Sequence, residues 1–171
     1  MWSPLRTWRV DLVLHLRLPV PTPRLLLLLI LALAVRWLFL LVFPNPDPTG
    51  DVRFDVESFR LVGKLLADGK DVYLETNRHL YLPFHMYVYQ FAGYLEDHVK
   101  LMNFFYWVRW VNIIAGLGIL VLIYKGSLRL GSSLTTAFWL AFLWAVQPVS
   151  IFTSVLHGQF DSVPAFFALS S

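Results

Sequence analysis

Residues 25–43 read LLLLLILALAVRWLFLLVF, an apolar run that a single charged residue, Arg36, interrupts. This run reaches the length that an α-helix needs to cross a hydrocarbon core of about 30 Å. Two further runs, residues 104–124 and 134–156, meet the same requirement. The sequence therefore predicts three complete transmembrane helices, and residues 162–171 begin a fourth.

The composition supports an all-α membrane protein, a multispan helical bundle. Hydrophobic residues make up 57% of the chain and charged residues 15%, whereas soluble domains average about half apolar and a quarter charged. The net charge is only +3 and the basic residues are spread along the chain, so nucleic acid is not an expected partner. The absence of cysteine excludes disulfides, thiolate metal sites and cysteine nucleophiles.

The distribution of charge predicts the orientation of the helices. Residues 1–24 carry four arginines and one acid, and the loop after the second helix carries Lys125 and Arg129 without an acid. Basic segments next to transmembrane helices face the cytoplasm, so both segments are expected there. Residues 44–103, with nine acids and six bases, form a large outer loop.

The outer loop is expected to carry amphipathic surface helices. Apolar residues at near-helical spacing predict a helix over residues 55–67, with Asp55 as its N-cap and Gly69 beyond its end. Residues 72–83 are expected to be irregular, and a second helix runs over residues 84–97 along the membrane surface. Four tyrosines of this region are expected at headgroup depth: Tyr81, Tyr87, Tyr89 and Tyr94.

Two carboxylates are the first candidates for chemistry, because the signatures of P-loop, dinucleotide-binding, zinc-peptidase and serine-hydrolase enzymes are missing. Asp51 and Asp55 follow the first transmembrane helix. A carboxylate at the lipid–water boundary can act as a general base when its environment adjusts its pKa. The alternative for Asp55 is a purely structural helix cap.

A second polar cluster, His157-Gly-Gln-Phe-Asp161, is expected at the outer end of the third helix. His157, Gln159 and Asp161 place hydrogen-bonding groups at the depth of a lipid-linked phosphate. The alternative is a polar turn between two helices, in which Asp161 caps the next helix.

Two arginines fall inside apolar runs. Arg36 lies deep in the first helix, where a charge is costly, so it faces a polar cavity or pairs with an acid elsewhere. Arg109 lies near the outer end of its helix, from which its side chain is expected to snorkel to water. The loop histidines have no carboxylate or cysteine at metal-ligand spacing, so no metal site is expected.

Three segments of the outer loop follow in a characteristic order: Phe54-Asp-Val-Glu-Ser-Phe59, Gly69-Lys-Asp-Val-Tyr73 and Tyr81-Leu-Pro83. Together they resemble the first outer loop of bacterial GT-C glycosyltransferases, polytopic enzymes that use polyprenyl-phosphate sugars. His157-Gly-Gln-Phe-Asp161 is similar to the GQ-F/Y-D segment of the same family. The resemblance covers residues 25–171.

The resemblance implies transfer of a hexose such as mannose from a polyprenyl-phosphate sugar to a glycan, lipid or protein acceptor at the outer face. Asp55, or Asp51 in its place, would be the general base. Candidate ligands of the lipid phosphate are His157, Gln159, Asp161 and Arg36. No divalent metal or other cofactor is expected. The location implied is a bacterial plasma membrane, with the N-terminus in the cytoplasm.

GT-C enzymes have ten or more helices, so residues 25–171 would be the N-terminal part of such a domain and can be inactive alone. The alternative is a non-catalytic membrane subunit or transporter fragment whose acidic loop binds a partner. Transporters of this kind show helices broken near mid-membrane. The three expected helices are largely intact in sequence, which disfavours transport.

Overall fold

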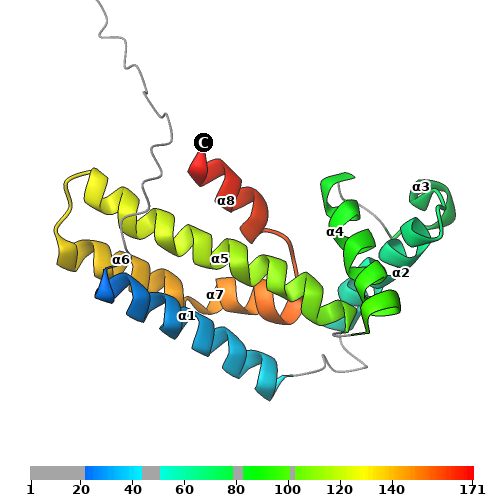
Figure 1. The fold of residues 1–171 in the computed structure, drawn as a ribbon, viewed down its shortest axis with the longest axis horizontal. Helices are drawn as coiled ribbons and strands as arrows, with labels where there is room; N and C mark the ends of the chain where they lie inside the picture. Colours follow the sequence, from blue (N-terminus) through cyan, green and yellow to red (C-terminus); the bar gives the residue numbers. More distant parts are fainter. Residues whose placement is uncertain (1–21, 44–50, 79–82, 101–102) are drawn as a thin grey trace, which may run out of the picture.

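The computed structural model describes residues 22–43, 51–78, 83–100 and 103–171, and every regular element within these residues is a helix. The elements form a bundle of long helices with a separate helical hairpin at one end (Figure 1). Most of the predicted outer loop is thus described, whereas residues 1–21 lie outside the described chain.

Two helices are each long and apolar enough to cross a membrane: α1 (Pro23–Val42) and α5 (Phe104–Arg129). The hydroxyl of Thr22 caps α1 by accepting from the Leu25 amide, and Pro23 occupies the first helical turn, where its missing amide hydrogen costs nothing. Both helices confirm the predictions made from the apolar runs over residues 25–43 and 104–124.

The third apolar run is broken. It forms α6 (Leu134–Val146), α7 (Pro148–Ile151) and the π-helical η2 (Phe152–His157), and the two halves meet at an angle of 46° beside Gln147. Pro148 lacks an amide hydrogen and its ring clashes with the preceding turn, so a straight helix cannot pass through it. The expectation of one continuous helix over residues 134–156 is therefore wrong, and the pair counts as a third span only if its halves are taken together.

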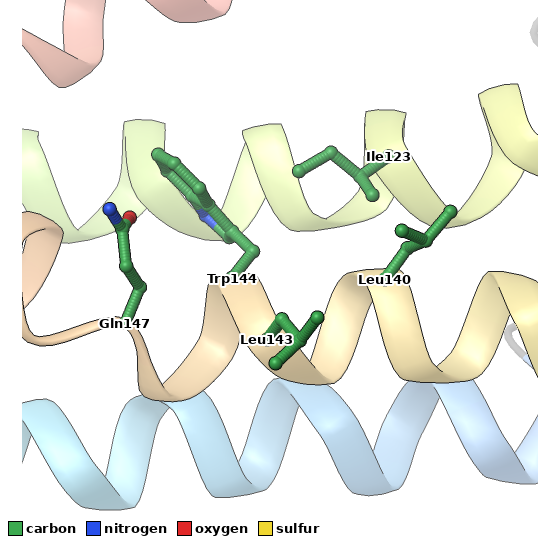
Figure 2. Close-up of a pocket in the computed structure, with 5 residues that line it drawn as sticks. All are labelled: Ile123, Leu140, Leu143, Trp144 and Gln147. Carbon is green, nitrogen blue, oxygen red and sulfur yellow. The ribbon is translucent and has the colours of Figure 1, made fainter.

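Small residues bring α6 close to its neighbours. Ala137, Ala141 and Ala145 recur every fourth position and are completely buried in the cluster that joins α1, α5 and α6, an arrangement that lets apolar helices approach closely. Figure 2 shows an open apolar groove between α5 and the last turns of α6. The groove is lined by Ile123, Leu140, Leu143, Trp144 and Gln147.

The helical hairpin consists of α2 (Asp51–Ala67), α3 (Val72–Glu75) and α4 (Pro83–Tyr94), which continues into the π-helical η1 (Leu95–Val99). The predicted helices over residues 55–67 and 84–97 are present. However, α2 begins four residues earlier than expected, so Asp55 lies inside it and is not its N-cap. The short α3, capped by Asp71, occupies part of the stretch expected to be irregular.

The helices α2 and α4 cross at glycines. A Cβ atom added to Gly63 would lie 2.5 Å from the carbonyl oxygen of Tyr89, and Gly93 faces Gly63 from the other helix. Beside this crossing, Phe59 stacks on Tyr89 with ring centroids 4.8 Å apart. Tyr89 is only 1% exposed, so its ring packs inside the hairpin, and its depth in a membrane stays a prediction.

Tyr87 and Tyr94 are exposed on α4, and Tyr81 lies outside the described residues. The last helix, α8 (Ser162–Ser170), turns back along α5 (Figure 1). There the ring of Phe166 covers Gly118 so closely that an added Cβ would lie 2.5 Å from it.

Candidate functional site at the end of the bundle

The structure brings three predicted site residues together at the end of the bundle nearest the hairpin. The Nε2 amide of Gln159 donates a long hydrogen bond of 3.5 Å to Oδ2 of Asp55, and Nδ1 of His157 lies 3.9 Å from the same oxygen. Asp55 is more than a hundred positions away from the other two in the chain. Their proximity therefore comes from the tertiary fold.

Asp55 is placed by α2, whose buried face anchors the helix. Val56, Phe59 and Val62 lie on that face and are nearly or fully buried. The side chain of Asp55 is 37% exposed, so its carboxylate has contact with solvent on one side and with the turn after η2 on the other.

His157 and Gln159 are placed by the turn that ends η2. Gly158 adopts φ 66°, a left-handed conformation that other L-residues adopt only at a cost. The backbone amide of Gln159 then donates to the carbonyl of Thr153 at 3.0 Å, and this bond closes the end of the helix. This closure directs the side chains on both sides of Gly158 towards α2.

Two polar side chains of α5 hold the same turn from the opposite side. Nη2 of Arg109 donates to the carbonyl of Leu156 at 3.3 Å, and Nδ2 of Asn112 donates to the carbonyl of Gly158 at 3.2 Å. Arg109 is 1% exposed and Asn112 is fully buried. The expectation that Arg109 snorkels to water is therefore wrong, because its guanidinium turns into the bundle.

The sequence alone did not indicate that Arg109 and Asn112 bond to this turn. The signal that could have indicated it is the spacing of three residues, which places Arg109 and Asn112 on one face of a helix inside an otherwise apolar run. Polar residues in such a run usually face the interior of a bundle.

Arg36 lies at a different place, the break between α6 and α7. Its Nη1 donates to the carbonyls of Ala32 and Ala145, both at 3.1 Å, and its Nη2 donates to Oγ of Ser150 at 3.3 Å. The side chain is 1% exposed. The charge thus lies at the C-terminal end of α6, where the helix dipole favours a cation.

The remaining predicted site residues take no part in the Asp55 cluster. Asp161 is exposed at the N-cap position of α8, without a capping hydrogen bond from its side chain. It also forms no hydrogen bond or ion pair with Asp55, His157 or Gln159. Asp51 begins α2, and its side chain lies outside what the structure describes. Among the described residues, no group of three or more histidines and carboxylates is arranged to hold a metal ion.

No family model, curated protein or solved structure matches this chain. The functional proposal therefore rests on the geometry of the site. The site consists of one half-exposed carboxylate in contact with an amide and an imidazole, held at the end of a bundle of apolar helices.

Proposed function

We propose that the protein is a membrane glycosyltransferase that moves a hexose, such as mannose, from a polyprenyl-phosphate sugar to an acceptor hydroxyl. The observation that carries the proposal is the approach of Gln159 and His157 to Oδ2 of Asp55. A general base must be held in position at the reacting hydroxyl, and these contacts restrain the Asp55 carboxylate. The resemblance of the same segments to GT-C enzymes supplies the substrate class.

The proposed reaction is a single displacement with inversion. Asp55 takes the proton from the acceptor hydroxyl while the oxygen of that hydroxyl forms a bond to the anomeric carbon of the sugar. The bond between that carbon and the lipid phosphate breaks, and the phosphate leaves with the electron pair. A Gln159 amide has two hydrogens, so one can orient Asp55 while the other, together with His157, stabilises the charge on the phosphate.

The proposed setting is the outer face of a bacterial plasma membrane, with a multi-pass chain and a cytoplasmic N-terminus. The partners are the bilayer, the lipid-linked donor and a glycan, lipid or protein acceptor. The scheme requires the lipid-linked donor and the acceptor, and no cofactor. Among the other predicted phosphate ligands, Asp161 would act from the start of α8, whereas Arg36 would act only indirectly, through the break that it holds.

The test measures transfer of a labelled sugar from a polyprenyl-phosphate donor in membranes that contain the protein. Asp55→Asn keeps the size of the side chain and removes the base, so we expect transfer to fall by about 10²- to 10⁴-fold. The matched control is Asp68→Asn, an exposed acid just beyond the end of α2, which should leave transfer unchanged. Equal transfer by wild type and Asp55→Asn at equal protein levels would refute the role of Asp55.

A second candidate function, a non-catalytic subunit or transporter fragment, is favoured by one observation. The third span is broken beside a buried arginine, and broken helices with buried charges line the substrate sites of many transporters. Absence of transfer by the wild-type protein, together with solute uptake into vesicles that Arg36→Ala abolishes, would favour this candidate.

A further inference from the structure

We propose that Arg109 and Asn112 are positioning residues that hold the turn of His157, Gly158 and Gln159 against Asp55. This inference rests on the proposed function, because it assigns the two residues a task in that same site. Neither residue contacts Asp55 in the structure. Their effect would pass through the backbone of the turn.

The first argument is the choice of acceptors. Arg109 donates to the carbonyl of Leu156 and Asn112 to the carbonyl of Gly158, so the two bonds fall on either side of His157. Because both donors come from adjacent turns of one helix, they fix the position and the tilt of the turn relative to α5. Asn112 also donates to the carbonyl of Val108 within its own helix at 3.2 Å, which restrains its amide.

The second argument is the cost of burying these groups. Nε and Nη1 of Arg109 and Oδ1 of Asn112 are buried without a hydrogen-bond partner, and no carboxylate in the described chain lies within ion-pair distance of Arg109. A buried charge without an acid partner is destabilising. Intramembrane charges that persist at such a cost are typically functional, and the one described bond of Arg109 outside its own helix goes to the turn.

The third argument is steric. A Cβ atom built on Gly158 would lie 3.7 Å from Cγ1 of Val108, in ordinary contact. The turn therefore rests directly on α5 between the two hydrogen bonds. The turn is held against α5 by Arg109 and Asn112 and is closed by the backbone amide of Gln159. Loss of either side-chain donor should therefore let His157 and Gln159 move away from Asp55.

Cysteine cross-linking tests this arrangement without requiring activity, since the chain has no native cysteine. The reporter pair is Asp55→Cys with Gln159→Cys, joined by a short bifunctional thiol reagent in membranes. The reference pair is Thr22→Cys with Tyr124→Cys, whose hydroxyls lie 3.1 Å apart between the start of α1 and the far part of α5. Each pair is combined with Asn112→Leu, Arg109→Leu or Arg109→Lys.

We expect Asn112→Leu, which is close in volume, and Arg109→Leu to slow cross-linking of the reporter pair by about tenfold, the change that loss of one buried hydrogen bond predicts. The reference pair should cross-link at its usual rate. Arg109→Lys retains a donor and should restore most of the reporter rate. The control Ser127→Ala removes a side-chain bond to a carbonyl within α5 and should change neither pair.

An unchanged reporter rate in both leucine variants would overturn the proposal, and so would equal slowing of both pairs in Asn112→Leu, because that result means general loosening. The outcome is independent of the transferase assay. If Asp55→Asn retains transfer but Asn112→Leu releases the reporter pair, the proposed function fails and the positioning role stands. If transfer is present, Asn112→Leu should lower kcat with little change in KM.

Discussion

The helical hairpin and the bent pair of helices over residues 134–157, taken together as the broken third span, solve the problem of helix association in different ways. In the hairpin, α2 and α4 approach through Gly63 and Gly93, aromatic rings stack beside the crossing, and Arg60 forms an ion pair with Glu96 at 3.1 Å. At the broken span, Arg36 of α1 donates to the carbonyl of Ala145 and the hydroxyl of Ser150, and Arg109 of α5 donates to the carbonyl of Leu156. One region pairs charge with charge, and the other pairs charge with freed backbone.

The difference follows from what each region must satisfy. A proline break frees carbonyls that water cannot reach inside an apolar bundle, and each unsatisfied group there costs several kcal/mol. A buried arginine supplies several donors at once and meets that need. In the hairpin, side chains stack and form an ion pair at its edge, and the Gln90 side chain of α4 donates to the carbonyl of Leu66 near the end of α2 at 3.1 Å.

The largest loss of stability is expected from a substitution at the contact between α2 and α4. Gly63→Leu would force its side chain against the backbone of Tyr89 and separate α2 from α4, so we expect a loss of about 3 kcal/mol in stability, at the upper end for overpacking. Thermal unfolding in detergent, followed by circular dichroism, measures it.

The matched control for that variant is Gly126→Ala. An added Cβ at Gly126 meets nothing within 4 Å, and alanine is a better helix former by about 1 kcal/mol, so this variant should be neutral or stabilising. If Gly63→Leu unfolds at the wild-type temperature, the close crossing does not hold the hairpin together.

The next largest loss of stability is expected from a substitution at the break between α6 and α7. Arg36→Lys keeps the charge, but one ammonium group at the end of a flexible stem cannot reproduce the guanidinium contacts to Ala145 and Ser150 together. We expect a loss of about 2 kcal/mol, because a buried carbonyl is left unsatisfied. Ser150→Ala removes only one acceptor and should cost less in the same unfolding assay; the reverse order would contradict this account of the break.

The smallest loss of stability is expected at the ion pair of the hairpin. The dependence of this loss on salt distinguishes the hairpin from the broken span. Glu96 accepts from Arg60 at 3.1 and 3.3 Å and also from the Phe104 amide at the start of α5. Glu96→Gln should cost about 1 kcal/mol, as expected of a partly exposed pair.

This cost should shrink in about 1 M salt, which screens exposed charges, whereas the cost of Arg36→Lys should persist. Unfolding of both variants at low and high salt provides the measurement. A salt-dependent Arg36→Lys effect would mean that the break in the third span is open to water.

The sequence predicted most of the helices because long apolar runs and near-helical spacing need only local information. It predicted an unbroken third helix because apolar content was weighed over Pro148. It made Asp55 a cap because aspartate is a favoured capping residue, whereas α2 already begins at Asp51. Each error arose where one local signal competed with another.

The candidate site was predicted only in part. Asp55, His157 and Gln159 could be grouped by their expected membrane depth, and the structure brings them into contact; their catalytic roles stay predictions. Arg109 and Asn112 could not be assigned to the turn from sequence. Their acceptors are backbone carbonyls, which any residue provides and which therefore leave no motif.

The length of α5 has a consequence for the bilayer. Its 26 residues extend about 39 Å at the rise of an α-helix, whereas the 20 residues of α1 extend about 30 Å, close to the thickness of a hydrocarbon core. The mismatch obliges α5 to tilt or to project into the headgroup layer. Lys125 and Arg129 in its last turns would then meet lipid phosphates, so bilayer thickness becomes a variable that acts on the same helix that supports the His157 turn.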